Sequence, residues 1–472
     1  MIAQPDTSVP VWKLSAADRK TLLWLTGLEI FFIYTGMVLK IGSLPGFPFF
    51  FATATAVCIY AIVGRSIPRS VVRFFGIVTA FFVAEFVVTY ERGISPIEQL
   101  KLLLVYLLAF PSVIMLFYAF IATGYDRIRQ FCGGIVVAMI VIGFCEVHLG
   151  MRPLMEAIIR IYQPTGWLYH ATVRDMITYG AIRPLVFAHE PSYVGLYSGT
   201  LAMFYMLLRP MWRPPVVHLA LAVALFAADV FVVRSPTTVY FLFAGLAGFV
   251  YFEIVSPANR ISPSTRKLLK YALLGLLTLS ALVIIAAPFV LYIAKPLLHN
   301  YAIRNYVSTS SFFLRLIGPG LIAAKTLLAV PLTGVGIAGE ARLFHIEEPI
   351  LILIGRVEAT SSATVNYASH YITNGFWEYF VYYGVGIGLL NLILLGGLFK
   401  RLGVRDRYLL VAMTVIMWQS TTGLNQPFPW LPVFCLGAVM RMRRSAEATI
   451  KKRFLAPPGG HGSLAASTNL SQ

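Results

Sequence analysis

Long apolar runs recur along the chain with the length that a membrane-spanning helix requires. Such a helix needs about 20 predominantly apolar residues. The runs lie at 21–39, 46–64, 72–90, 100–123, 131–149, 191–208, 216–233, 237–255, 271–293, 375–399 and 408–441. The last run is too long for one span and contains the polar stretch QSTTGLNQPFP at 419–429, so we divide it into two shorter helices. The pattern therefore predicts about 12 transmembrane helices.

The composition excludes a soluble globular protein. Of the 472 residues, 58% are hydrophobic and only 12% are charged, whereas soluble domains carry about 25% charged residues. A single aqueous core stops growing at roughly 250–300 residues, so most of this apolar surface must lie in lipid. We therefore expect an all-α polytopic membrane protein.

The basic residues predict the orientation of the chain in the membrane. The net charge is +18, from 38 Lys and Arg against 20 Asp and Glu. When alternate connections are assigned to the cytoplasm, they collect most of the basic residues, and the short connections on the other side hold only Lys40, Arg92, Lys101 and Arg234. The positive-inside rule then places both termini in the cytoplasm. The charge thus reflects topology, and we expect no nucleic-acid partner.

Two long external segments set the expected organisation. The expected parts are membrane helices 1–5 in 1–149, a first large periplasmic loop at 150–190, helices 6–9 in 191–293, a second large periplasmic loop at 294–374, helices 10–12 in 375–441, and a disordered cytoplasmic tail at 442–472. Loops longer than about 15 residues are usually functional or disordered. These two are too apolar and aromatic to be disordered, so we expect the function on the outer face.

The first loop begins with a short amphipathic pattern at 151–163. Its apolar residues fall on one helical face and its charged residues, such as Arg152 and Arg160, fall on the other. The segment is too short to span and suits the membrane interface. The alternative is a lid without a chemical role.

The end of the first loop carries the candidate residues Arg174, Arg183 and Glu190. Pro191 stands where a helix would start, so Glu190 would lie at the positive end of that helix. There the dipole and free amide groups stabilise a carboxylate or bind an anion. The alternative is an N-terminal cap with Arg183 as a surface partner, and local spacing leaves both interpretations open.

The second loop contains an apolar stretch at 321–332 that is too short for a full span. It is bounded by GPG and PLTGVG, and a re-entrant or interfacial helix fits this pattern. Arg315 precedes the stretch, and Gly334 and Gly336 follow it and would allow a ligand to approach the backbone closely. The alternatives are that Arg315 snorkels to the interface and that the glycines only form turns.

The second loop ends with His370 and Asn374 at the mouth of the tenth helix, and Glu378 lies one turn deeper. On a helix the three share a face. A histidine with polar neighbours can act as a proton acceptor. The alternative is that His370 is a structural residue with its hydrogen bonds satisfied.

Taken in order, these motifs resemble the integral-membrane O-antigen polymerase and ligase superfamily, which includes the Wzy-type glycan polymerases and the lipid A ligases. The first matching feature is a chain of roughly twelve helices whose largest external loop lies toward the C-terminal end. The others are Arg183 upstream of the triplet Glu190-Pro191-Ser192, and Arg315 ahead of a segment that ends in PLTGVG with Gly334 and Gly336. The last is His370-x-x-x-Asn374, which enters a helix with a glycine-rich middle. The motifs cover about residues 150–400. The sequence departs from the pattern at the apolar insertion EEPILILIGRVEA, which follows the glycine-rich turn.

The resemblance implies glycosyl transfer between undecaprenyl-pyrophosphate-linked sugars at the periplasmic face of the bacterial inner membrane, without a metal or cofactor. It implies that external arginines hold the pyrophosphate, and Arg forks bind phosphate oxygens in pairs. Arg183 and Arg315 are the first candidates, and Arg174 and Arg304 are the reserves. For the group that activates the acceptor hydroxyl, His370 is the first candidate and Glu190 the second.

The Glu-Pro-Ser triplet is more typical of polymerases than of ligases in this superfamily. The expected function is therefore a repeat-unit polymerase for O-antigen, capsule or exopolysaccharide. Its expected partners are the lipid-linked donor and acceptor and membrane lipid, and a chain-length regulator is a further candidate. One alternative is a ligase that transfers finished glycan to the lipid A core. The other is a flippase or transporter, motivated by ionisable residues inside apolar runs, namely Glu29, Glu85, Glu146 and Asp229.

Overall fold

Every apolar run described above contains a helix. The computed structural model describes residues 14–39, 47–88, 96–163, 172–210, 212–255, 261–293, 318–336, 339, 342–347, 372–424 and 426–455. The longer helices are α1 (Ala16–Thr35), α2 (Phe50–Val63), α3 (Arg69–Val88), α4 (Pro96–Thr123), α5 (Tyr125–His148), α8 (Pro191–Leu207), α9 (Pro215–Val233), α10 (Pro236–Val255), α11 (Pro263–Ile293), α17 (Gly375–Arg401), α18 (Arg407–Trp418) and α19 (Trp430–Leu455). The division of the last apolar run at its polar centre is therefore confirmed at the level of helices.

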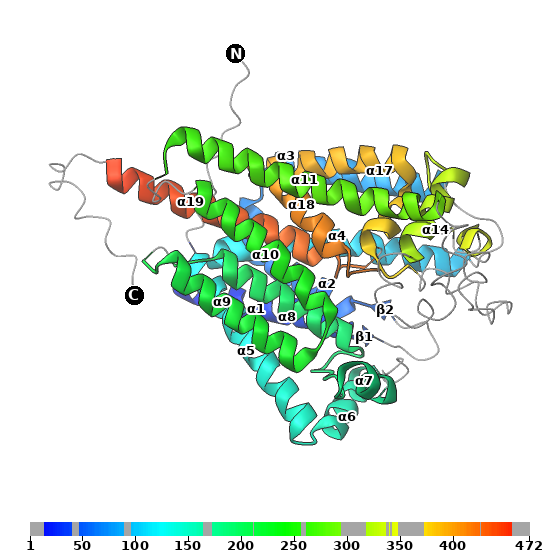
Figure 1. Cartoon of the computed structure of the whole chain (residues 1–472), viewed down its shortest axis with the longest axis horizontal. Helices are drawn as coiled ribbons and strands as arrows, with labels where there is room; N and C mark the ends of the chain where they lie inside the picture. Colours follow the sequence, from blue (N-terminus) through cyan, green and yellow to red (C-terminus); the bar gives the residue numbers. More distant parts are fainter. Residues whose placement is uncertain are drawn as a thin grey trace, which may run out of the picture.

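Shorter elements connect these helices. They are the two-residue strands β1 (Val38–Leu39) and β2 (Phe47–Pro48), the 3-10 turn η1 (Gly64–Ser66), and the helices α6 (Arg152–Tyr162), α7 (Thr172–Tyr179) and α14 (Gly318–Ala329). The helices predicted at 151–163 and 321–332 correspond to α6 and α14, whereas α7 was not predicted. In Figure 1, α6, α7 and α14 lie toward one end of the bundle, and the C-terminal end of α19 lies toward the other.

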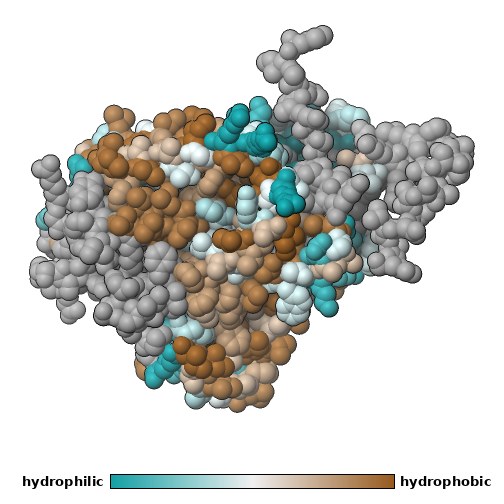
Figure 2. All heavy atoms as spheres, turned by 180° about the vertical axis from the view of Figure 1, so that it is seen from behind, coloured by the Kyte–Doolittle hydropathy of each residue, from teal (hydrophilic) through white to brown (hydrophobic). Residues whose placement is uncertain are grey.

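Six helices of the described chain are long and apolar enough to cross a membrane. They are α3, α5, α9, α17, most of α4 (Leu103–Thr123) and most of α10 (Pro236–Ile254). Large hydrophobic side chains point outward from these helices, for example Val87 and Phe231, and Figure 2 shows hydrophobic residues over much of the described surface. Such a surface is suited to contact with lipid. The protein is thus a helical membrane protein.

The central helix of the bundle is α8, whose side chains are buried over most of its length. It packs against α5, α9, α10 and α19. Its residues Gly195 and Gly199 are one turn apart. A Cβ atom added at Gly195 would lie 2.5 Å from Ser235, which directly precedes α10, and one added at Gly199 would lie 3.1 Å from Phe241 of α10. Small residues at this spacing allow two helix backbones to approach closely. The GxxxG pattern therefore fixes α8 against α10.

A buried network of ion pairs joins four helices at the end of the bundle away from α6 and α14. Arg209 at the end of α8 forms two hydrogen bonds with Glu253 of α10 (2.8 and 3.2 Å). Arg443 of α19 also donates to Glu253 (2.6 Å), and Arg444 forms two bonds with Asp406 before α18 (2.6 and 2.7 Å). These arginines were interpreted as topology markers alone, but they also tie α8, α10, α18 and α19 together.

The C-terminal region differs from the expected organisation. The segment from 442 was predicted to be a disordered tail, but α19 continues to Leu455. The ion pairs of Arg443 and Arg444 hold the beginning of this extension, and Glu447 accepts a hydrogen bond from each of them (both 3.3 Å). The beginning of the expected tail is therefore a helix that these ion pairs hold against the bundle.

Candidate functional site

The segment before α8 is a turn held in a strained conformation. Val186 and Phe187 have positive φ angles of 42° and 70°, and each such residue costs about 1–3 kcal/mol. The carboxylate of Glu146, at the end of α5, accepts hydrogen bonds from the backbone N–H groups of Leu185 (2.8 Å) and Val186 (2.9 Å). The Tyr34 hydroxyl donates to the Val186 carbonyl (2.8 Å). These contacts stabilise the turn.

Two side chains of α6 reinforce the same turn. Arg152 donates to the Glu146 carboxylate (3.2 Å) and to the Arg183 carbonyl (2.7 Å). The Tyr162 hydroxyl donates to the Phe187 carbonyl. The amphipathic helix therefore has a structural role, because it holds the segment that leads to Glu190.

The predicted pyrophosphate ligand Arg183 is anchored inside the protein by α7. Its Nε lies 3.1 Å from Asp175 Oδ1, and the two side chains are only 2% and 0% exposed. Its guanidinium carbon also lies 4.7 Å from the centre of the Tyr179 ring. Because Asp175 and Tyr179 both belong to α7, this helix orients Arg183. Its role as a phosphate ligand stays a prediction.

Glu190 immediately precedes α8, as the sequence predicted. Pro191 is the first residue of the helix, Ser192 is the second, and Glu190 has an extended backbone (φ −142°, ψ 138°). The Glu190 side chain makes no capping hydrogen bond. Glu190 is therefore the N-cap residue of α8, but its half-buried carboxylate does not cap the helix and remains near its positive end. Arg183, which the capping alternative placed at the surface, is buried against Asp175.

His189 is a second ionisable group at this helix end, and no role was predicted for it from the sequence. Its ring centre lies 4.6 Å from that of Tyr193 in α8. Its Nδ1 is buried and has no hydrogen-bond partner among the described residues. Burial lowers the pKa of His189 below its usual value, and the neighbouring carboxylate of Glu190 opposes this shift. The imidazole is thus neutral at neutral pH and able to accept a proton.

Asn374 is the N-terminal cap of α17. Its Oδ1 accepts hydrogen bonds from the backbone N–H groups of Phe376 (3.1 Å) and Trp377 (3.2 Å), the usual role of an asparagine at this position. Its Nδ2 donates to Gln419 Oε1 (2.9 Å). The asparagine of the His-x-x-x-Asn motif therefore joins the start of α17 to the turn after α18.

Glu378, one turn deeper in α17, orders the polar turn between α18 and α19. Its buried carboxylate accepts hydrogen bonds from the N–H groups of Gly423 (2.8 Å) and Leu424 (3.1 Å) and from the Thr422 hydroxyl (3.0 Å). The polar stretch that interrupted the last apolar run is thus a structured turn, and Glu378 stabilises it.

Tyr193 brings the two motif regions together. Its ring centre lies 4.6 Å from that of His189 and 5.1 Å from that of Phe428. Phe428 in turn packs over Gly423, where an added Cβ would lie 2.8 Å from the Phe428 ring. The segment with His189 and Glu190 therefore lies beside the turn that Glu378 orders, although the two are far apart in the sequence.

The glycine-rich turn after α14 packs into a break in α17. The helix is interrupted at Gly384, which has φ 60° and ψ −169°. Backbone hydrogen bonds join the two segments, from Val335 N–H to Val381 O (2.9 Å), Gly336 N–H to Tyr382 O (2.9 Å), Val385 N–H to Pro331 O (2.7 Å) and Ile387 N–H to Leu332 O (3.0 Å). The turn thus satisfies backbone groups that the break would leave without partners.

This arrangement corrects the interpretation of Gly334. A Cβ atom there would lie 2.5 Å from backbone atoms of Val381, Tyr382 and Gly384, and Gly334 and Gly336 have φ angles of 64° and 80°. The close approach that requires glycine at 334 is therefore to the backbone of α17, where we had expected a ligand.

Other predicted site residues lie outside the described residues, namely Arg304, Arg315 and His370. Arg174 belongs to α7, where the structure describes its backbone only. The structure therefore brings Arg183, Glu190 and Asn374 into the bundle end that holds α6 and α7. The proposed roles of Arg183 and Glu190 in binding and catalysis, like those of the other four residues, stay predictions. Within the described part of the chain, no three His, Cys, Asp or Glu side chains gather as a metal site would require.

The acidic residues inside the apolar runs have different environments. Glu146 is engaged by the turn before α8, and Asp229 accepts hydrogen bonds from the hydroxyls of Ser198 (2.8 Å) and Thr238 (3.2 Å). Glu29 is fully buried, and neither of its carboxylate oxygens has a partner among the described residues. Two of the four acids that suggested a transport pathway thus have structural contacts.

No family model matches the chain, and a search of curated proteins finds no significant match. The resemblance to the O-antigen polymerase and ligase superfamily therefore rests on the motifs of this sequence, and the function that it implies is a proposal.

Proposed function

We propose that the protein is a polysaccharide repeat-unit polymerase of the bacterial inner membrane. It transfers a growing glycan from undecaprenyl pyrophosphate to an incoming lipid-linked repeat unit at the periplasmic face, in O-antigen, capsule or exopolysaccharide biosynthesis. The observation that carries the proposal is the packing of Tyr193 between His189 and Phe428. It unites the Glu-Pro-Ser segment with the turn beside the His-x-x-x-Asn helix, at one end of a membrane bundle.

In the proposed topology the chain spans the membrane 12 times, about the number of apolar runs, with both termini in the cytoplasm. The segments at 150–190 and 294–374 are then periplasmic. A hydrophobic donor and acceptor reach the external end of the bundle laterally from the bilayer, and α6 lies at this end. A cysteine introduced at Gly180, which is exposed, should react with a membrane-impermeant reagent added from outside, and protection would contradict this orientation.

The proposed reaction is a displacement at the anomeric carbon of the donor sugar. The acceptor hydroxyl forms the new C–O bond, the bond between the sugar and pyrophosphate breaks, and the pyrophosphate leaves with the electron pair. Arginines such as Arg183 and Arg315 would stabilise the charge on the leaving group. The hydroxyl proton passes to a base, which contributes about 10²- to 10⁴-fold.

The candidate bases are His370 and Glu190, and mutagenesis distinguishes them. His370→Ala should nearly abolish polymerisation while donor binding is retained, and Arg315→Ala should abolish it without loss of membrane-inserted protein. If His370→Ala keeps full activity while Glu190→Gln does not, the base is Glu190.

The ligase and the transporter are the alternatives, and gene deletion distinguishes the first of them. Loss of a polymerase leaves single repeat units, whereas loss of a ligase leaves long chains on undecaprenyl pyrophosphate. The transporter has less support than the sequence alone gave it, because the carboxylates of Glu146 and Asp229 accept hydrogen bonds from neighbouring segments. Two large external segments are also unnecessary for a carrier.

A further inference from the structure

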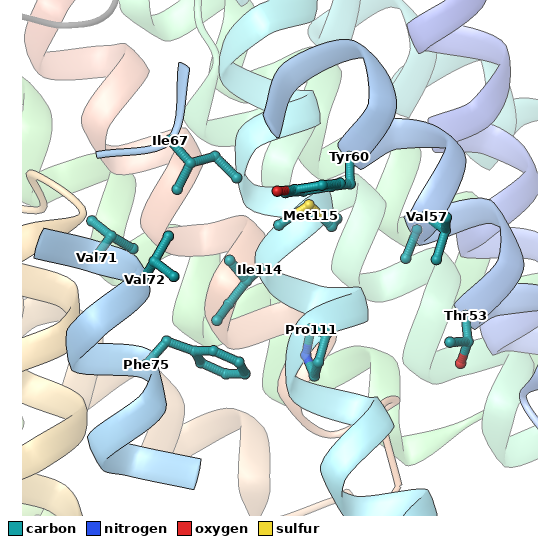
Figure 3. Close-up of a pocket in the computed structure, with 11 residues that line it drawn as sticks. Thr53, Val57, Tyr60, Ile67, Val71, Val72, Phe75, Pro111, Ile114 and Met115 are labelled. Atoms are coloured by element: carbon teal, nitrogen blue, oxygen red, sulfur yellow. The ribbon is translucent and has the colours of Figure 1, made fainter. Parts of the chain in front are cut away.

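An apolar groove opens sideways between α2, α3 and α4. It has a volume of about 260 Å³. Figure 3 shows side chains converging on it from the three helices, among them Val57 and Tyr60 from α2, Val72 from α3, and Pro111 and Met115 from α4. Its wall presents only apolar surface. The groove is smaller than most pockets for whole small molecules, which measure about 300–1,000 Å³, and it suits part of a single hydrocarbon chain.

The groove faces the lipid rather than the centre of the bundle. Val57, Tyr60 and Val72 are 62%, 56% and 55% exposed, and α3 and α4 are both candidate membrane spans. The hydroxyl of Thr53, another lining residue, donates to the carbonyl of Phe49 directly before α2 (3.1 Å) and offers the groove no free polar group. A hydrocarbon chain is therefore the occupant that this wall favours.

Three arginines stand at one end of the groove. Arg65 belongs to η1, and Arg69 and Arg73 belong to the first two turns of α3. All three are exposed, and none forms an ion pair with a described residue. Ile67, between Arg65 and Arg69 in the chain, itself lines the groove. The apolar wall therefore leads directly to a cluster of positive charge.

A further guanidinium lies at the same end of the bundle. Arg401, the last residue of α17, stacks over the ring of Phe74 in α3 at 3.9 Å. Arginines bind phosphate oxygens well, and basic pockets between membrane helices are known sites for anionic lipid headgroups. An apolar groove that ends in exposed arginines thus has the complementarity for a lipid with a phosphate at its head.

We propose that this groove binds one anionic glycerophospholipid. One acyl chain lies against Val57, Val72 and Met115, and the phosphate contacts Arg65 and Arg69, with Arg73 beside them. The proposal is independent of the proposed glycosyl transfer, because the groove is lined by none of the motif residues. It assigns these arginines a ligand in addition to their part in orienting the chain.

Native mass spectrometry of the full-length protein in detergent tests the proposal. The protein is incubated with phosphatidylglycerol or with phosphatidylcholine of the same acyl chains, and the retained lipid is counted. We expect one phosphatidylglycerol to be retained in preference to phosphatidylcholine. At about 1 kcal/mol per arginine, Arg65→Gln with Arg69→Gln should weaken retention about 30-fold. Val57→Trp should also reduce it by filling the groove.

Matched variants control for charge and for bulk. Lys267→Gln with Arg405→Gln removes two exposed charges elsewhere, and Val137→Trp adds an indole at another exposed position, on α5. Both should retain lipid as the wild type does. If Val57→Trp does not fold, Val72→Trp fills the groove from α3. Equal retention of the two lipids, or wild-type retention by the arginine variant or by the folded groove variant, overturns the proposal.

Discussion

Replacing Glu146 by leucine removes the acceptor that holds the turn before α8. The carboxylate receives the backbone N–H groups of Leu185 and Val186, and each hydrogen bond to a charged group contributes about 1.5–3 kcal/mol. Loss of both destabilises the turn by roughly 3–6 kcal/mol. The turn also contains the unfavourable φ angles of Val186 and Phe187, so the lost bonds should allow it to open locally.

Hydrogen–deuterium exchange measured by mass spectrometry reports on these two amides directly. At about 1.4 kcal/mol for each tenfold change, the amides of Leu185 and Val186 should exchange on the order of 10²–10⁴ times faster in Glu146→Leu. The matched control is Glu156→Leu, because Glu156 pairs with Arg152 in a partly exposed ion pair. Such pairs contribute at most about 1 kcal/mol, which corresponds to about fivefold. Unchanged slow exchange in Glu146→Leu would refute the reasoning.

Three further predictions follow from the packing of the site. Gly334→Ala should destabilise the protein by about 2 kcal/mol or more, because its Cβ meets the α17 backbone. The control is Gly396→Ala, because Gly396 has open space around it; this variant should leave the thermal unfolding temperature in detergent unchanged or raise it. Equal effects of Gly334→Ala and Gly396→Ala would contradict the fit of the turn into α17. Asp175→Ala should lower the free energy of unfolding by about 3–5 kcal/mol, because it leaves the Arg183 charge buried without this partner. A decrease of less than about 1 kcal/mol, measured by chemical denaturation, would contradict the importance of the pair. Protonation of His189 would place a positive charge beside Glu190, one of the two candidate bases, and burial lowers the pKa of His189, so the polymerisation rate should fall as the pH drops through a value below about 6.5. His189→Gln should lower the rate and flatten this acid limb, and His148→Gln should change neither. An unchanged limb in His189→Gln excludes His189 as its origin.

The positions of the long helices could be predicted from the sequence because apolar runs of this length have few alternatives in a membrane. The start of α8 was also predictable, since Pro191 marks a first helical residue. By contrast, α7 has only eight residues, too few for its apolar positions to establish a helical period. It is fixed by the contacts of Asp175 and Tyr179 with Arg183, which no local sequence signal reveals.

The candidate site was predictable in its residue types but only partly in their contacts. The positive φ angles of Val186 and Phe187 oppose the preferences of these residues, so only tertiary contacts through Glu146 could impose them. Gly334 was recognised as a place of close approach, but its partner in α17 is distant in the sequence. Glu146 suggested a transport pathway because it lies inside an apolar run. Its backbone partners are 39 and 40 residues away, so the sequence around Glu146 does not reveal them.

The central claim, glycan polymerisation by this protein alone, is tested most directly with the purified protein in liposomes. The liposomes contain a lipid-linked repeat unit and no energy source, and the products are separated by length. We expect lipid-linked glycans of two or more repeat units, formed with release of undecaprenyl pyrophosphate. Repeat units that remain single, while the folded protein is present in the membrane, would contradict the claim.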